Sequence, residues 1–234
     1  MDVVIDPRFN GPPESGHGGY SAGRAAALVD TEPGGAVEVT LRRPVPLATP
    51  LAVAVDPGGG VELSAGGEVV MTARPVPAPE ATAEPVVDVA RARAAADPAA
   101  WAEGHPFPTC FGCGPHRDPD DALCLYPGAA GDGRHAVAWV PADWAGDAGI
   151  VAPELVWAAV DCPSSAPAAS AFPLVLGRLT VAIGEAPVRV GGEYVVETWL
   201  EAAEGRKHHT AVALHDGAGT VHARGRATWI ALTG

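Results

Sequence analysis

An aspartate at the end of an apolar run is the residue of this sequence best suited to carry out chemistry. Asp161 directly follows the apolar residues 155–160. A carboxylate on such a segment loses solvation, which raises its pKa unless hydrogen bonds compensate. It could then act as a general base that removes a proton from water. A structural hydrogen-bond acceptor or a helix cap before Pro163 would explain the same aspartate, and both interpretations stay open.

A second group of candidate residues lies near the N-terminus. His17 is followed by Gly18 and Gly19 at the start of another apolar segment. Glycines at the start of a helix leave backbone N–H groups sterically open, and the helix dipole adds positive potential there. His17 could orient a substrate or a water, and Asn10 on the same loop could contact a substrate carbonyl. A loop histidine bonded to nearby backbone, and an asparagine that shapes a turn, are the simpler alternatives.

Two further residues beside the run 155–160 could react but have simpler explanations. Cys162 could act as a nucleophile, but the sequence shows no partner base for it. We therefore interpret it as a small buried hydrophobic residue. Glu154 lies in the first turn of the same predicted helix, where the helix dipole favours a negative charge.

A pair of cysteines gives a competing signal. Cys110 and Cys113 are separated by two residues, which is half of a zinc site, and His105, His116 and Cys124 could complete it. The ten-residue gap to Cys124 is not a common ligand spacing. Two packed, reduced thiols in a turn explain the pair more simply, and no thioredoxin-like context favours a redox pair. We expect no metal and no cofactor.

The elements that must position these residues occur in the same order twice. Residues 18–29 are small or apolar apart from Arg24, which is typical of a buried helix. Residues 153–160 predict a second helix, with Pro153 at a permitted early position. Alternation and turn residues predict strands after each helix. The first set is 37–41, 51–55, 61–63 and 69–72, and the second is 179–183, 194–200, 210–215 and 221–230, with a further strand at 136–140 before the second helix. Residues 75–106 read as a linker with a short helix at 88–96.

This order of loop, central helix and long antiparallel strands resembles the hotdog fold, and two copies in one chain are similar to the double-hotdog acyl-CoA thioesterases. The residues that carry the resemblance are 17–20, 153–161, 187–191, 205–207, 213–217 and 223–229. The resemblance implies an α+β fold with two tandem hotdog units, each a curled antiparallel sheet around a central helix. We expect units at 1–85 and 129–234, joined by 86–128 with the Cys110-x-x-Cys113 loop.

The resemblance also implies a reaction. In hotdog thioesterases a carboxylate on one central helix acts as base or nucleophile, and faces N–H groups at the start of the partner helix that polarise the thioester carbonyl. Asp161 matches the carboxylate, and Gly18 and Gly19 match the N–H groups. The first helix has alanines, 25–27, in the equivalent stretch, so at most one cleft should be catalytic. Members similar to acyl-CoA thioesterase II add a threonine and a glutamine, whereas the last strand here offers Thr228 and no glutamine can be placed there.

The resulting hypothesis is a thioesterase that acts on an acyl-CoA or acyl-carrier thioester. Asp161 and His17 are its expected catalytic residues, and Asn10, Gly18 and Gly19 are expected to bind substrate and oxyanion. Three alternatives remain. They are a non-catalytic protein that binds an acyl thioester or small ligand, a hotdog dehydratase that pairs His17 with Asp161, and a zinc-stabilised scaffold centred on residues 105–124.

Composition limits the partners and the compartment. The chain has 234 residues and a net charge of −13, which argues against a nucleic-acid-binding surface. No segment approaches the roughly 18 apolar residues of a membrane span, and the first residues show no secretory signal. We therefore expect a cytoplasmic protein with reduced thiols and no membrane partner. The resemblance, together with apolar strand faces, predicts a homodimer.

Overall fold

The strands of the first half follow the alternation of apolar and polar residues in the sequence. The computed structural model describes residues 2–171 and 173–232. The elements of this half are β1 (Asp2–Val3), η1 (Pro7–Phe9), α1 (Gly18–Ala26), β2 (Ala36–Leu41), β3 (Leu51–Val55), β4 (Val61–Ala65) and β5 (Glu68–Val76). Gly66 and Gly67 join β4 to β5 with φ angles of 58° and 82°, which glycine adopts without strain. Because β5 continues to Val76, the predicted linker begins later than residue 75.

The second half contains the longest strands. Its elements are β6 (Gly128–Gly131), β7 (Arg134–Trp139), η2 (Asp143–Ala145), β8 (Gly146–Asp147), β9 (Ile150–Val151), α4 (Pro153–Asp161), η3 (Cys162–Ala171), β10 (Leu174–Ile183), β11 (Tyr194–Glu204), β12 (Lys207–Asp216) and β13 (Val221–Ala231). The 3-10 segment η3 continues α4, a feature that the sequence did not predict. Pro163 and Pro167 lack the N–H that an α-helix requires, while a tighter turn tolerates them. The α-helix therefore ends at Asp161, and the chain stays coiled beyond it.

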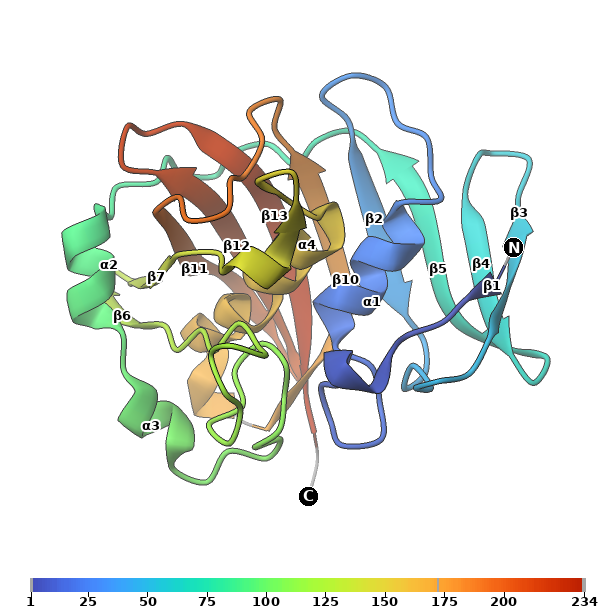
Figure 1. Ribbon diagram of the computed structural model, residues 1–234, viewed down its shortest axis with the longest axis horizontal. Coiled ribbons are helices and arrows are strands. Elements are labelled where there is room, and N and C mark those ends of the chain that lie inside the picture. The colour runs from blue at the N-terminus through green and yellow to red at the C-terminus, as the bar shows by residue number, and fades with distance from the viewer. Residues whose placement is uncertain (1, 172, 233–234) are drawn as a thin grey trace.

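The sheets of the two halves form one continuous antiparallel sheet, as Figure 1 shows. The strand order is β1-β3-β4-β5-β2-β10-β13-β12-β11-β7-β6. The junction is the pair β2–β10, in which residues 37–40 face residues 178–181. The two sheets therefore lie side by side, and the predicted α+β fold class is confirmed.

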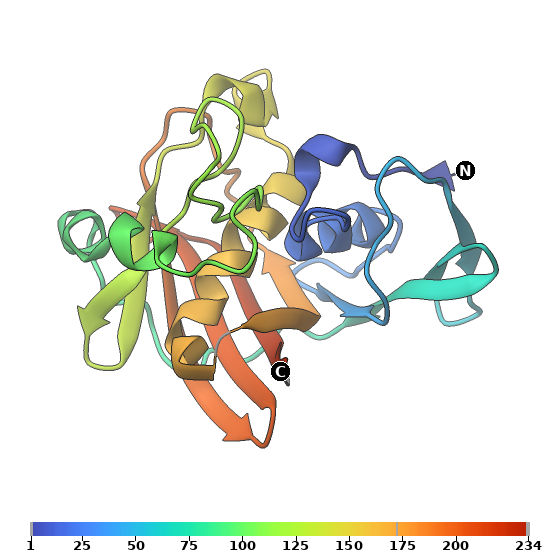
Figure 2. The ribbon, with the colours of Figure 1, turned by 90° about the horizontal axis from the view of Figure 1, so that it is seen from below.

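The two central helices cross the same face of this sheet next to each other (Figures 1 and 2). Glycines on α1 allow close contact with α4. A Cβ on Gly19 would lie 2.4 Å from Asp161 Cβ, and one on Gly23 would lie 2.6 Å from Glu154 Cα. The start of α1 therefore meets the end of α4, and the helices run in opposite directions. Within residues 2–171 and 173–232, no helix is long and apolar enough to cross a membrane.

A buried glutamate anchors the segment that joins the halves. This segment contains α2 (Val89–Ala95) and α3 (Pro98–Ala102). Glu197 on β11 accepts hydrogen bonds from Val86 N and Val87 N, each at 2.9 Å, and from Arg134 Nη1 at 2.7 Å. Because the carboxylate is fully buried, these donors compensate for its lost solvation. The join is thus attached to the second half, while the exact limits of the two units stay a prediction.

Candidate active site

A cavity of about 400 Å³ lies where the start of α1 meets the end of α4. Its walls come from the loop before α1, the loop around residues 105–113, the end of α4, and strands β10 and β13. The lining residues that could take part in a reaction are His17, Gly18, Cys110, Cys113, Asp161 and Cys162. Both halves contribute to this wall, so neither half alone could form the site.

Asp161 is buried and lines this cavity. Its side chain is held by Gly19 N–H, which donates to Oδ2 at 2.6 Å. The other oxygen, Oδ1, is buried and has no hydrogen-bond partner among the described residues. Burial raises the pKa of Asp161 to about 6, and the opposing effects of His17 and Gly19 N–H are smaller. The positive end of α1 faces the carboxylate, and with a pKa of about 6 most of the carboxyl group is ionised at neutral pH.

His17 links the carboxylate to a thiol. It is the N-cap of α1, only 1% exposed, and its Nδ1 accepts a hydrogen bond from Tyr20 N–H at 3.2 Å. The same Nδ1 lies 3.4 Å from Asp161 Oδ2, and Nε2 lies 3.1 Å from Cys162 Sγ. When Nδ1 is bare it caps the helix, and when it is protonated it can donate to Asp161.

The charge state of His17 follows from its neighbours. Burial alone would lower the pKa of the imidazole, but the charge of Asp161 and the contact with Cys110 together outweigh it, so the pKa is raised above 6.5. Carboxylate and imidazolium therefore stabilise each other in the cavity.

A cluster of thiols beside His17 was not predicted from the sequence. Cys110 Sγ lies 3.7 Å from Cys162 Sγ, and Cys113 Sγ lies 3.4 Å from His105 Nε2. The thiols of Cys113 and Cys162 hydrogen-bond to Cys110 and lower the pKa of Cys110 well below its usual range. Cys162 and His17, which lie next to Cys110, are distant from it in the sequence, so the spacing of residues around Cys110 could not predict these contacts.

Cys124, which the sequence suggested as a third ligand, lies outside this cluster. Its Sγ lies 3.8 Å from Arg117 O. Burial raises the pKa of the Cys124 thiol, which keeps it protonated at neutral pH.

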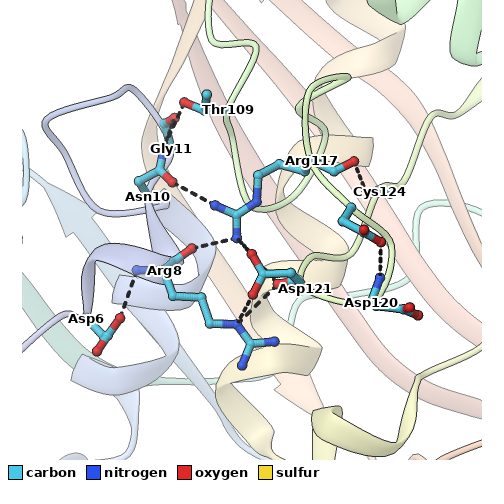
Figure 3. A network of polar contacts seen from close by, with 10 residues as sticks. Asp6, Arg8, Asn10, Gly11, Thr109, Arg117, Asp120, Asp121 and Cys124 are labelled. Atoms are coloured by element: carbon cyan, nitrogen blue, oxygen red, sulfur yellow. Dashed lines mark hydrogen bonds and ion pairs between the residues drawn. The ribbon is translucent and has the colours of Figure 1, made fainter.

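Asn10 does not line the cavity. Figure 3 shows its side chain in a polar network between the N-terminal loop and the loop that follows Cys113. Its Nδ2 donates to Gly11 O at 3.0 Å and to Thr109 Oγ1 at 3.2 Å, and its Oδ1 accepts from Arg117 Nη1 at 3.2 Å. These bonds occupy the amide and hold the two loops together.

The two glycines have different positions in the site. Gly19 N–H is bonded to Asp161, so it orients the carboxylate. Gly18 lines the cavity, and as the first residue of α1 its N–H has no partner within the helix. Of the two donors predicted for a substrate oxygen, Gly18 is therefore the one available.

A serine fixes the backbone at the junction of α4 and η3. Ser164 Oγ donates to Asp161 O at 2.6 Å and accepts from Trp229 Nε1 at 2.9 Å. Both side chains are buried. The end of α4 is thereby tied to β13, which limits the motion of Asp161.

Solved structures with this architecture cover nearly the whole chain at low sequence identity. A protein from Novosphingobium aromaticivorans DSM 12444 described as a "putative thioesterase" is 17% identical, with a TM-score of 0.64 over 100% of this chain and 95% of that chain. The tesB protein of Mycobacterium avium subsp. paratuberculosis is 13% identical, with a TM-score of 0.63 over 99% of this chain and 92% of that chain. A "putative thioesterase II" from Thermobifida fusca YX is 14% identical, with a TM-score of 0.62 over 99% of this chain and 92% of that chain.

The sequence comparisons give no closer link. No protein-family model and no curated protein matches the chain. The identities are low enough that the structural matches establish the architecture and nothing finer. Together with the single sheet and the paired central helices, they show that this chain has the double-hotdog fold.

Proposed function

We propose that this protein hydrolyses acyl thioesters carried by coenzyme A or by an acyl-carrier group. The observation that carries this proposal is the state of Asp161. It lines the cavity, is 2% exposed and is anchored through Oδ2, while Oδ1 is buried and unpaired among the described residues. Hydrolysis of a thioester requires an oriented base and a donor for the oxyanion, and here Asp161 lies beside Gly18 N–H, which has no partner within its helix.

The reaction follows from these positions. Asp161 Oδ1 takes a proton from a water molecule while the water oxygen attacks the thioester carbonyl carbon. The N–H of Gly18 donates to the carbonyl oxygen as it becomes negative. When the tetrahedral intermediate collapses, the carbon–sulfur bond breaks and the leaving thiolate takes the proton from Asp161. His17 keeps the carboxylate oriented through its Nδ1.

The character of the cavity supports an acyl group with a charged carrier. Leu174, Leu176 and Trp229 give part of the wall an apolar character that suits an acyl chain. Arg42 and Arg43 also line the cavity, and both are exposed. Guanidinium groups bind phosphates well, so they could hold the phosphates of coenzyme A or phosphopantetheine.

Replacement of the proposed base tests the function. We expect Asp161→Asn to fold normally and to lower turnover of acyl-CoA substrates by roughly 10²-fold or more, the scale of general-base catalysis. Release of free thiol measures the rate. Glu154→Gln removes a carboxylate from the other end of α4 and serves as the control, with hydrolysis unchanged. A folded Asp161→Asn with full activity would remove the proposed role, and binding without turnover in the wild type would indicate a binding protein.

A dehydratase is the second candidate because His17 Nδ1 lies 3.4 Å from Asp161 Oδ2. Such enzymes pair these two groups across the helices. The other nitrogen of His17 is directed at Cys162, which leaves the histidine less free to exchange a proton with substrate. With a 3-hydroxyacyl-CoA as substrate, a dehydratase would form the enoyl thioester, which its absorbance detects, and would release no free thiol.

A further inference from the structure

The ligand atoms of His17, Cys110 and Cys162 meet at one point beside the cavity, and Cys113 packs in the same buried cluster. Cys110 and Cys113 come from the loop before β6, Cys162 is the first residue of η3, and His17 caps α1. All four side chains are buried. Three segments that are far apart in the sequence therefore each contribute a group that can bind a soft metal ion.

The sulfur–sulfur distance fits a tetrahedral ion. With Zn–S bonds of about 2.3 Å, two sulfurs of a tetrahedral site lie about 3.8 Å apart. Cys110 Sγ and Cys162 Sγ are 3.7 Å apart. His17 Nε2 lies 3.1 Å from Cys162 Sγ, and these three ligand atoms are within 4.8 Å of one another. Cys113 packs with Cys110 and Cys162 in one buried cluster, and its Sγ lies 3.4 Å from His105 Nε2, so its thiol is at hand as the fourth ligand.

Two glycines allow the loop to approach this point. A Cβ on Gly112 would lie 2.5 Å from His17 Nε2 and 2.6 Å from Cys162 Sγ. A Cβ on Gly114 would lie 2.4 Å from Cys110 N, and Gly114 N–H donates to Cys110 O at 2.8 Å. The tight turn directs both cysteines of the pair to one side. Larger residues at these positions would displace the ligands.

We propose that the thiolates of Cys110, Cys113 and Cys162 and Nε2 of His17 bind one zinc-class divalent ion. This ligand set, three thiolates and one imidazole, is a common structural zinc site. The three thiols release their protons on binding. This proposal replaces the sequence-based expectation of no metal, and it does not depend on the hydrolase.

Ion binding would connect the cluster to the carboxylate. With Nε2 bound to the ion, the imidazole proton resides on Nδ1, which lies 3.4 Å from Asp161 Oδ2. A metal-bound histidine that donates to a carboxylate is a recurring arrangement. Tyr20 N–H, which donates to Nδ1 in the other tautomer, would then lose that acceptor. The ion thus selects the tautomer of His17 that orients Asp161.

Metal content of the full-length protein tests the site. The wild type, expressed in zinc-supplemented medium and purified without chelator, is expected to contain one zinc per chain by elemental analysis. Cys113→Ser is expected to lose the ion, and Cys124→Ser, a cysteine of the same loop outside the cluster, to retain it. His17→Ala should weaken binding, whereas His105→Ala should not. Loss on His105→Ala with retention on His17→Ala would overturn the ligand set.

A second measurement covers variants that fail to fold. Metal-free wild type titrated with Co²⁺ should develop the charge-transfer absorption of cobalt–thiolate bonds, with saturation at one ion per chain. A wild type that contains no zinc and gives no such absorption would overturn the proposal. Asp161→Asn separates the two proposals, since it should keep the ion and lose hydrolysis.

Discussion

Asp161 is held in a charge state that costs folding energy. Burial raises its pKa, the end of α4 adds negative potential, and Gly19 N–H and His17 oppose these effects. A carboxylate placed in this way is a stronger base than an exposed aspartate, because its conjugate acid forms more readily. The two following predictions separate the catalytic and the energetic consequences.

The rate of hydrolysis should depend on a single ionisation near pH 6. The carboxylate form of Asp161 is the active base, and its pKa is raised to about 6. We therefore expect kcat/KM to be constant above this pH and to fall about tenfold per pH unit below it. The measurement is a pH–rate profile with a substrate that has no ionising group in this range. A profile that stays flat from pH 5 to 7 would contradict this assignment.

The free energy of unfolding should depend on the same ionisation, but it should fall as the pH rises, whereas the rate increases. Because the folded-state pKa of Asp161 is raised, its contribution is most favourable below the unfolded value of 3.8 and is lost as the pH rises through about 6. Asn does not titrate. The stability of the wild type relative to Asp161→Asn should therefore fall by about 3 kcal/mol between pH 3 and pH 8. Denaturant unfolding of both proteins at several pH values measures this difference, and a constant difference would exclude a buried carboxylate.

At this scale the sequence predicts single residues better than their partners. The apolar run before Asp161 indicates a buried carboxylate, and the structure places it beside His17 and Gly18. The meeting of Cys162 with Cys110 could not be predicted, because the contact depends on where a long loop packs. Gly19 was expected to donate to the substrate oxygen, whereas its N–H donates to Asp161 Oδ2. The chain also contains no glutamine, so the glutamine of acyl-CoA thioesterase II-like proteins has no counterpart here.

At the scale of elements, the contact between α1 and α4 positions the site. Gly23 has no room for a side chain, because an added Cβ would lie 2.6 Å from Glu154 Cα. The close approach of the helices brings the start of α1 to the carboxylate at the end of α4. Any change that separates the helices should therefore reduce stability and also move Gly19 N–H away from Asp161.

Gly23→Ala should destabilise the protein although alanine favours a helix. The clash costs about 1–3 kcal/mol, and the gain in helix propensity is up to about 1 kcal/mol. Gly217→Ala is the matched control, since its Cβ would meet only Val89 Cγ2 at 3.7 Å. Chemical denaturation of the three proteins gives the comparison. Equal stability of Gly23→Ala and the wild type would show that the helix contact is not as close as described.

Both helices and most strands could be predicted from periodicity, whereas η3 could not. The prolines at 163 and 167 are signals that end an α-helix, and the sequence alone does not show that a 3-10 segment follows. The full lengths of β10 to β12 could not be predicted either: β11 and β12 continue into polar residues, and β10 begins with an apolar stretch, residues 174–176, ahead of the predicted strand.

At the scale of the whole molecule, the pair β2–β10 joins two sheets, each of which would otherwise end there in an unpaired strand. The cavity lies at one end of this junction, where residues 41–45 and 174–177 line it, and uses residues of both halves. The repeated order of helix and strands predicted this arrangement, since an open sheet edge favours pairing. The identity of the pairing strands required the structure.

The two halves should unfold together. The continuous sheet and the contact of α1 with α4 couple them, so we expect one cooperative transition in denaturant, with secondary structure and tryptophan fluorescence changing at the same concentration. A protease that cuts within residues 77–85 should leave both fragments associated on gel filtration. Two transitions, or fragments that separate and stay folded, would contradict this coupling.

The ends of the long sheet have a consequence for how the protein behaves at high concentration. One end is β1, a strand of two residues, and the other is β6, a strand of four residues against which α2 packs. Few unpaired amides are therefore presented to a neighbouring molecule, so strand-by-strand growth into fibrils has almost no template. The predicted homodimer would have to use a face or a loop surface, and self-association should stop at a discrete particle.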